Sequence, residues 1–292
     1  MLNVQNLNIY YGRKQVIKEA TFQIQPGEIV GLIGPNGAGK TTIMKTLLGL
    51  TKFTGTINFN HQPITANSHQ ALQQVGALIE NPAVYPFLSG RENLELYFRD
   101  TTDMNRLIDR LGMGTYIDEP AKSYSIGMKQ KLGIALALLN KPEFVILDEP
   151  MNGLDIEATI LVRQIIHEYA AQGTAFLISS HVLSELQKVM TSVIILNHHE
   201  IVMNVPIDQF KNAPVTQYQI KTVDNEAVAK ILKGNNIFYR HQDQSLFINT
   251  TDIDQVQAIL CHHQIMLREL VPVRQTFEQA IVEVLREKRV DE

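Results

Sequence analysis

The chain is short of cysteine, of long apolar runs and of positive charge. Cys261 is its single cysteine, so no disulfide can form within the chain, and we expect this thiol to be buried as a small apolar group. Apolar runs such as 134–139 and 193–196 fall far short of the roughly 20 residues that a membrane-spanning helix needs. These shortages exclude an intramolecular disulfide framework and predict that the chain itself does not cross a membrane.

The beginning of the chain lacks a secretory signal, because residues 2–9 alternate like a strand instead of pairing a basic segment with an apolar one. We therefore expect a cytoplasmic protein. The formal net charge of -4 disfavours a broad cationic face, so no nucleic-acid partner is expected. A length of 292 residues and a hydrophobic share of 45% fit an ordinary globular protein of about two domains.

Residues 1–212 follow an α/β pattern. The apolar run 29–33 ends in glycine and a helix is expected from Lys40, while runs 144–147 and 175–178 have the character of strands buried on both faces. A helix over 156–171 carries its apolar residues on one stripe, so strand, helix and strand form a parallel crossover. The mostly helical segment of about 81–141 interrupts this pattern and predicts an inserted subdomain.

Residues 213–292 change to the order βαββαβ, which predicts a small α+β domain of the ferredoxin-like type. The boundary is expected at Asn212 to Pro214. Thr276 and Gln279 have the spacing of a capping box before a last, amphipathic helix, which we expect to pack against the protein. No residue of this domain indicates a ligand, so the sequence leaves its role open.

A glycine-rich loop between the strand 29–33 and the following helix fits the pattern G-x-x-x-x-G-K-[ST]. Glycines let backbone N–H groups approach phosphates closely, and the helix N-terminus adds positive potential. Lys40 is expected to reach the β and γ phosphates of a nucleotide, and Thr41 to offer its hydroxyl to Mg²⁺. The predicted phosphate-binding residues are Gly34, Pro35, Asn36, Gly37, Ala38, Gly39, Lys40, Thr41 and Thr42.

Two adjacent carboxylates, Asp148 and Glu149, follow the apolar run 144–147. Ligands collect at the C-terminal ends of strands in open α/β sheets, and alternation along a strand directs neighbouring side chains apart. We expect Asp148 to support Mg²⁺ and Glu149 to orient or deprotonate the attacking water. The two motifs together predict a P-loop ATPase.

A third motif, Ser125-Ile-Gly127-Met-Lys-Gln130, lies shortly before this strand. It resembles the signature sequence of ABC transporter ATP-binding subunits, usually Leu-Ser-Gly-Gly-Gln. The residues around Asp155 resemble the D-loop of that family, and His181 resembles its switch histidine. The resemblance covers about residues 1–210 with all motifs in order, and it implies an ABC nucleotide-binding domain with a helical subdomain.

The resemblance also implies roles and partners. Tyr11 matches the aromatic residue that stacks on adenine, Asp155 counts among the nucleotide-binding residues, and His181 is expected to contact the γ-phosphate. Two such subunits, identical or paired with a different one, would meet head to tail, so that Ser125 and Gly127 act on the ATP of the partner. The chain would lie on the inner face of the cell membrane, bound to a separate permease. Residues 85–88 would help form the groove that binds a cytoplasmic helix of this permease. The alternative is that 85–88 are only a packed loop of the insertion.

Two departures from the family pattern stand out. Glu80 takes the place of the expected glutamine of the Q-loop, where it could ligate Mg²⁺ but has no amide N–H to donate. Ile126 and Met128 replace a glycine and a glutamine of the signature. This combination resembles the ATPase subunits of bacterial exporters for bacitracin and for lantibiotic self-immunity.

Other functions fit the sequence less well. A soluble ABC ATPase acting on nucleic acid or ribosomes usually has two fused nucleotide domains or long coiled coils, whereas this chain has one such domain, no heptad run and a negative net charge. A P-loop kinase would leave the signature and D-loop motifs as coincidences. The sequence does not identify the transported substrate.

Overall fold

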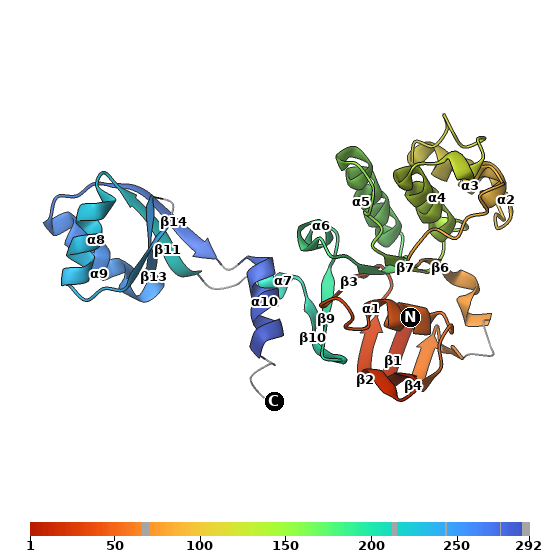
Figure 1. Ribbon diagram of the computed structural model, residues 1–292, viewed down its shortest axis with the longest axis horizontal. Helices are drawn as coiled ribbons and strands as arrows, with labels where there is room; N and C mark the ends of the chain where they lie inside the picture. Colours follow the sequence, from red (N-terminus) through yellow and green to blue (C-terminus); the bar gives the residue numbers. More distant parts are fainter. Residues whose placement is uncertain (66–69, 212–214, 243, 275, 288–292) are drawn as a thin grey trace. The chain divides into compact units, whose positions relative to one another are not determined.

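A computed structural model describes residues 1–65, 70–211, 215–242, 244–274 and 276–287. The chain forms two compact units, Met1–Asp208 and Gln209–Glu292, which are treated separately below (Figure 1). The expected boundary at Asn212 to Pro214 lies outside the described residues.

The first unit is built on a six-stranded sheet with the order β10-β9-β3-β8-β7-β6. Five strands are parallel and β10 pairs with β9 antiparallel at the edge. All five residues of each of β3, β7 and β8 are buried, as expected for central strands covered on both faces. The strands are β3 (Ile29–Ile33), β6 (Val75–Leu78), β7 (Phe144–Asp148), β8 (Ala175–Ser179), β9 (Ser192–Asn197) and β10 (Glu200–Pro206).

A second, antiparallel sheet has the order β2-β1-β4-β5. Its inward residues share one apolar cluster with helix α1 (Lys40–Leu47) and with the central strands, so the helix that follows the glycine-rich loop is packed firmly on both sheets. The strands are β1 (Leu2–Tyr11), β2 (Lys14–Ile24), β4 (Phe53–Phe59) and β5 (Gln62–Pro63).

The helical part lies between β6 and β7 in the chain and gathers at one end of the unit (Figure 1). Asp100 and Ser125 cap two of its helices through their side-chain oxygens, and Ser89 forms a capping box with Glu92. The helices are α2 (Gly90–Glu95), α3 (Thr101–Arg110) and α4 (Ile126–Leu138), with the 3₁₀ turn η2 (Ala121–Ser123) before α4. Another 3₁₀ turn, η1 (Gln70–Gln74), precedes β6.

The connections α5 (Ile156–Ala171) and α6 (Leu183–Gln187) complete this unit, and α7 (Asp208–Lys211) stands at the boundary of the two units. The predicted helix over 156–171 and the predicted strand over 29–33 are confirmed with the same bounds. Among the described residues, no helix combines the length and the apolar character needed to span a bilayer.

The second unit has the predicted βαββαβ order and an antiparallel sheet arranged β12-β13-β11-β14. Its own apolar core includes Ile220, Leu246 and Leu260. The elements are β11 (Val215–Thr222), α8 (Asn225–Gly234), β12 (Tyr239–Gln242), β13 (Ser245–Asn249), η3 (Thr250–Asp252), α9 (Ile253–His262), β14 (Leu267–Arg274) and α10 (Phe277–Glu287).

Two predictions for this unit can be compared with the structure. The capping box is confirmed, since the Thr276 N–H donates to Gln279 Oε1 at 2.9 Å and the Gln279 N–H donates to Thr276 Oγ1 at 3.2 Å. The expectation that Cys261 is buried is wrong, because its side chain is exposed. The buried stripe of α9 runs through Val256 and Leu260, and the next residue along a helix turns about 100° away from that stripe.

Gly76 shows how closely the helical part packs on the sheet. A Cβ at Gly76 of β6 would lie 1.7 Å from the carbonyl oxygen of Ala137 in α4, so any side chain there forces the two elements apart. We expect Gly76→Ala to lower the free energy of unfolding by about 1–3 kcal/mol, the usual cost of overpacking. Gly114→Ala is the control, because Gly114 has open space around it.

Urea unfolding followed by far-UV circular dichroism measures both variants, since the chain contains no tryptophan to report by fluorescence. Equal midpoints for wild type and Gly76→Ala would contradict the close approach of β6 and α4.

Candidate functional site

The glycine-rich loop lies between β3 and α1, where sequence reasoning placed it. Gly39 precedes α1 with φ 108°, a left-handed conformation that favours glycine. A Cβ at Gly34 would lie 2.4 Å from the carbonyl oxygen of Leu196, so the loop can run this close to β9 only with glycine. The loop is therefore shaped by its own sequence and by the neighbouring strand.

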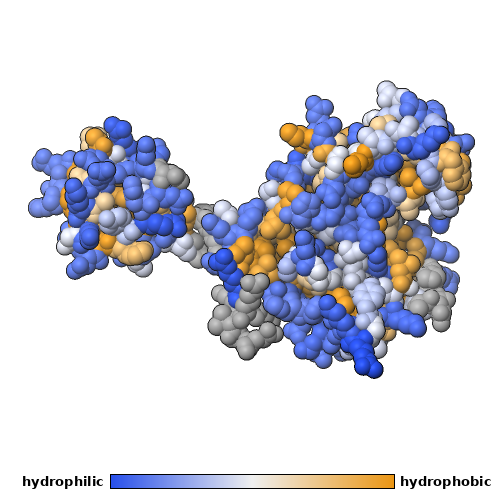
Figure 2. Space-filling model, in the orientation of Figure 1, coloured by the Kyte–Doolittle hydropathy of each residue, from blue (hydrophilic) through white to orange (hydrophobic). Residues whose placement is uncertain are grey.

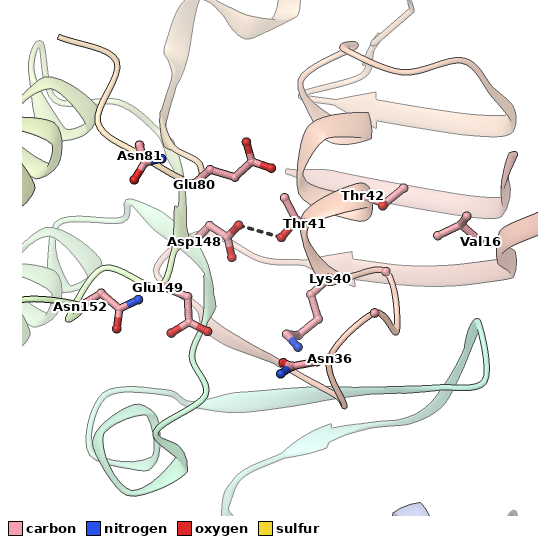
Figure 3. Close-up of a pocket in the computed structure, with 12 residues that line it drawn as sticks. Val16, Asn36, Lys40, Thr41, Thr42, Glu80, Asn81, Asp148, Glu149 and Asn152 are labelled. Carbon is pink, nitrogen blue, oxygen red and sulfur yellow. Dashed lines mark hydrogen bonds between the residues drawn. The ribbon is translucent and has the colours of Figure 1, made fainter. Parts of the chain in front are cut away.

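A cavity of about 450 Å³ opens beside this loop (Figure 3). It brings together the loop, the start of α1, the segment after β6 and the end of β7. The residues that line it are Val16, Asn36, Gly37, Gly39, Lys40, Thr41, Thr42, Glu80, Asn81, Asp148, Glu149 and Asn152. The structure thus gathers Lys40, Thr41 and the two carboxylates from widely separated parts of the chain.

Lys40 points into this cavity and donates to the backbone carbonyls of Gly34 at 2.8 Å and Pro35 at 3.2 Å. Burial lowers the pKa of its ammonium group, while the negative charges of Glu149 and Asp148 act in the opposite direction. A half-buried cation held only by carbonyl dipoles is well placed to exchange them for the charged oxygens of a phosphate.

Asp148 is held from two sides at the end of β7. Its Oδ2 accepts from the Thr41 hydroxyl at 2.8 Å, and its Oδ1 accepts from the Ser179 hydroxyl of β8. A hydroxyl beside a carboxylate is a donor set of hard oxygens, which fits Mg²⁺ shared with substrate phosphates. Within the described part of the chain no group of three or more His, Cys, Asp or Glu residues could hold a metal ion.

Glu149 has a left-handed backbone with φ 52°, unlike Asp148 before it. Its Oε2 accepts from the backbone N–H of His181 at 3.1 Å and lies 2.7 Å from His181 Nδ1. The two carboxylates therefore have different partners, Thr41 and Ser179 for one and His181 for the other. This arrangement keeps the Glu149 carboxylate at the cavity wall without tying it to the magnesium donors.

Glu80 also has a left-handed backbone, with φ 60°, and lines the same cavity. Its Oε1 lies 2.6 Å from Lys45 Nζ in the last turn of α1, and this contact raises the pKa of Lys45. In Figure 3 the Glu80 side chain lies on the same side of the cavity as Thr41. Glu80 is thus near the expected magnesium donors but is paired with a lysine.

Of the predicted residues, Gly34, Pro35, Ala38 and His181 are not in the lining of this cavity, and four more lie at other places in the first unit. Ser125 caps α4 by accepting from the Met128 N–H at 3.2 Å, and Asp155 caps α5 by accepting from the Ala158 N–H at 2.7 Å. Tyr11 ends β1 with half of its surface exposed, and Gly127 lies in the first turn of α4. None of these four is among the residues that line the cavity.

Sequence reasoning missed several residues of the site. Ser179 and Lys45 hold Asp148 and Glu80, and Gln130 donates to the carbonyls of Glu149 and Pro150 at 3.1 Å each. Val16 lines the cavity from β2. Gln130 ends the signature motif and Ser179 lies two residues before His181 in another recognised motif, so these motifs were the signal that could have drawn attention to both residues.

Comparisons with known proteins identify the family of the chain. The family model described as "ABC transporter" matches residues 17–152. The ABC transporter ATP-binding protein YdbJ of Bacillus subtilis, itself uncharacterised, is 32% identical over 97% of this chain and 94% of its own length. The lantibiotic transport ATP-binding protein SrtF of Streptococcus pyogenes is 36% identical over 73% of this chain and 93% of its own.

A further relative is the bacitracin transport ATP-binding protein BcrA of Enterococcus faecalis, 33% identical over 80% of this chain and 79% of its own. Among solved structures, an ATP-binding subunit of an ABC transporter superposes with a TM-score of 0.68 and 30% identity, covering 72% of this chain and 92% of that one. The phosphate loop, the paired carboxylates and these relatives lead to one conclusion: the chain belongs to the family of ABC transporter ATP-binding proteins, which hydrolyse ATP to drive transport.

Proposed function

We propose that this ATPase drives a bacterial exporter of peptide antibiotics, of the bacitracin or lantibiotic kind, by acting on a separate membrane permease. The observation that carries the ATPase part is that Lys40, Thr41, Asp148 and Glu149 line one and the same cavity. The export part is supported by the names of SrtF and BcrA and by the glutamate at position 80. In this proposal the protein is cytoplasmic and attached to the inner face of the membrane through the permease.

The roles within the site follow from the contacts. Lys40 binds the β and γ phosphates, helped by the backbone N–H groups of the loop and helix start from Asn36 to Thr42. Thr41 and Asp148 would hold Mg²⁺, with Glu80 as a further ligand once it leaves Lys45. When bound, Mg²⁺ supplies positive charge that offsets the charge developing on the phosphate oxygens.

Glu149 orients or deprotonates the attacking water, because its carboxylate faces the cavity and is not bonded to Thr41 or Lys40. His181 fixes this carboxylate through its backbone N–H and its ring. Its ring is also more than half exposed, so it remains available for the γ-phosphate contact expected of it. Tyr11 is proposed to stack on adenine at the exposed end of β1.

Two ATPase subunits are proposed to work together. The exposed start of α4 offers backbone N–H groups and the Ser125 hydroxyl as an anion site, with Gly127 beside them. Neither Ser125 nor Gly127 lines the cavity of its own subunit, which supports contact with the ATP of a second copy or a related subunit. Asp155 at the start of α5 would join that interface.

The permease is proposed to bind the helical part near α2. Tyr85 and Phe87 are exposed there, Phe87 to 72%, and their rings lie 5.8 Å apart. Leu96, Tyr97 and Phe98, which follow α2 in the chain, are exposed as well. Figure 2 shows pale orange, apolar side chains over this part of the surface. Buried Asn93 holds the loop by accepting from the Tyr85 N–H and donating to the Tyr85 carbonyl, so the rings are presented by a fixed backbone.

Glu149→Gln is expected to retain ATP binding and to lower kcat by about a hundredfold or more, because the phosphate cradle survives while water activation is lost.

Lys40→Ala is expected instead to weaken ATP binding by about ten- to a hundredfold, the cost of losing a charge-assisted hydrogen bond. Phosphate release and nucleotide titration separate the two effects. Near-normal turnover in Glu149→Gln would remove the role assigned to this carboxylate.

Phe87→Asp is expected to abolish co-purification with the permease while leaving ATP hydrolysis by the free subunit intact, because it places a charge in an apolar contact far from Lys40. Val223→Asp in the second unit is the matched control, since Val223 is also exposed to about the same degree. Full assembly of the Phe87→Asp subunit with its permease shows that the permease binds elsewhere.

The proposed substrate is tested by expressing the chain with candidate permeases in a host sensitive to bacitracin and to lantibiotics. Wild type is expected to raise the inhibitory concentration of one of these peptides, and Glu149→Gln to give no protection because transport needs turnover. An assembled, ATP-hydrolysing complex that protects against neither peptide would exclude this substrate class and leave the ATPase assignment in place.

A further inference from the structure

The backbone of Glu149 adopts a conformation that its own sequence does not favour. A left-handed φ of 52° is costly for a residue with a Cβ, so the surroundings must hold it. Its N–H donates to the Ser179 carbonyl at 3.2 Å and to the Ser179 hydroxyl at 3.1 Å. β8 therefore fixes the amide side of Glu149, and the carbonyl side needs a partner of its own.

Gln130 of α4 supplies that partner. Its Nε2 donates to the carbonyl oxygens of Glu149 and Pro150, each at 3.1 Å, which uses both N–H groups of the amide. The Asn152 N–H also donates to the Glu149 carbonyl at 3.1 Å, within the same turn. Gln130 is 5% exposed, so water cannot easily replace its two hydrogen bonds.

The first turn of α4 packs against the same loop at a second place. A Cβ at Gly127 would lie 2.7 Å from the Gly153 carbonyl oxygen, and a Cβ at Gly153 would lie 2.5 Å from Ile126 Cγ2. The helix start and the loop 149–153 are thus in direct contact at both ends of the loop. A displacement of α4 must displace the backbone of Glu149 or break the bonds to Gln130.

We propose that Gln130 is a positioning residue for Glu149: it fixes the backbone that aims the carboxylate at the attacking water, and it links that aim to the placement of α4. The inference rests on the role proposed above for Glu149. Gln130 touches neither the phosphate loop nor Lys40, so its contribution belongs to turnover and not to nucleotide binding. Ser125 caps the N-terminus of α4, the helix that carries Gln130. An anion bound at this N-terminus therefore acts on the helix that holds Glu149 in place.

Gln130→Met tests the proposal, because methionine keeps the length of the side chain and removes both donors. We expect kcat for ATP to fall about ten- to a hundredfold, the loss that a small misplacement of a reacting group produces, while the Kd for ATP changes less than about twofold. Gln130→Glu, which keeps the shape of the amide without its N–H groups, is expected to show the same split.

Thr174→Val is the matched control, since it removes another buried hydrogen bond from a side chain to a backbone carbonyl, that of Pro142 at 2.8 Å, away from the cavity. We expect it to keep kcat within about twofold of wild type. A comparable loss of kcat in Thr174→Val would show that Gln130 contributes only general stability.

The decisive measurement is a double-mutant cycle with Glu149→Gln in single-turnover assays of the full chain. If Gln130 acts through Glu149, adding Gln130→Met to Glu149→Gln changes the residual rate less than about twofold. The proposal is overturned if the rate losses of the two single variants multiply in the double variant. It is also overturned if both Gln130 variants fold and keep the wild-type kcat, or if they lose only affinity for ATP. Normal turnover in Glu149→Gln alone is a different result, which rejects the role of Glu149 itself.

Discussion

The hydrogen bond from Thr41 to Asp148 joins the two halves of the site. Thr41 stands in the first turn of α1, and Asp148 ends β7, which is separated from β3 by β8 in the sheet. The bond therefore depends on the parallel sheet that brings the ends of β3 and β7 to the same edge. Ser179 of β8, the strand between them, donates to the same carboxylate, so Asp148 of β7 is held by the neighbouring strand and by the helix that follows β3.

Each charged group of the cavity already has a partner, and this decides how it can respond to a nucleotide. Lys40 is held by two carbonyls, Asp148 by two hydroxyls, Glu149 by His181 and Glu80 by Lys45. Binding of ATP, and of the magnesium proposed to accompany it, must exchange some of these contacts. The neutral partners of Lys40 and Asp148 cost the least to give up, because a phosphate or a metal offers a stronger, charge-assisted interaction. The ion pair of Glu80 with Lys45 distinguishes the site from one with a neutral glutamine.

Local features of the sequence predicted the local parts of the structure. The glycine-rich loop, the stripe of α5 and the capping box before α10 depend on residues within a few positions of one another, and the structure has all three. The contacts of Ser179, Lys45 and Gln130 join residues 31, 35 and 19 positions apart, so no periodicity indicated them, and the motif that ends at Gln130 did not indicate its partners. The error at Cys261 came from treating an apolar residue as a core residue, although its neighbour Leu260 occupies the buried stripe.

Gly127 illustrates why a motif residue cannot be assigned a function from the motif alone. The family pattern explains this glycine by contact with the nucleotide of a second subunit, but the structure gives it a reason within its own subunit. A side chain there would strike the carbonyl of Gly153, and the same loop carries Glu149 at its other end. A substitution of Gly127 would therefore disturb Glu149, the carboxylate proposed to act on water in its own site, as well as any contact with a partner. Ser125 is different, because its side chain is exposed and bonded only to the first turn of α4, so its replacement tests the contact between subunits more cleanly.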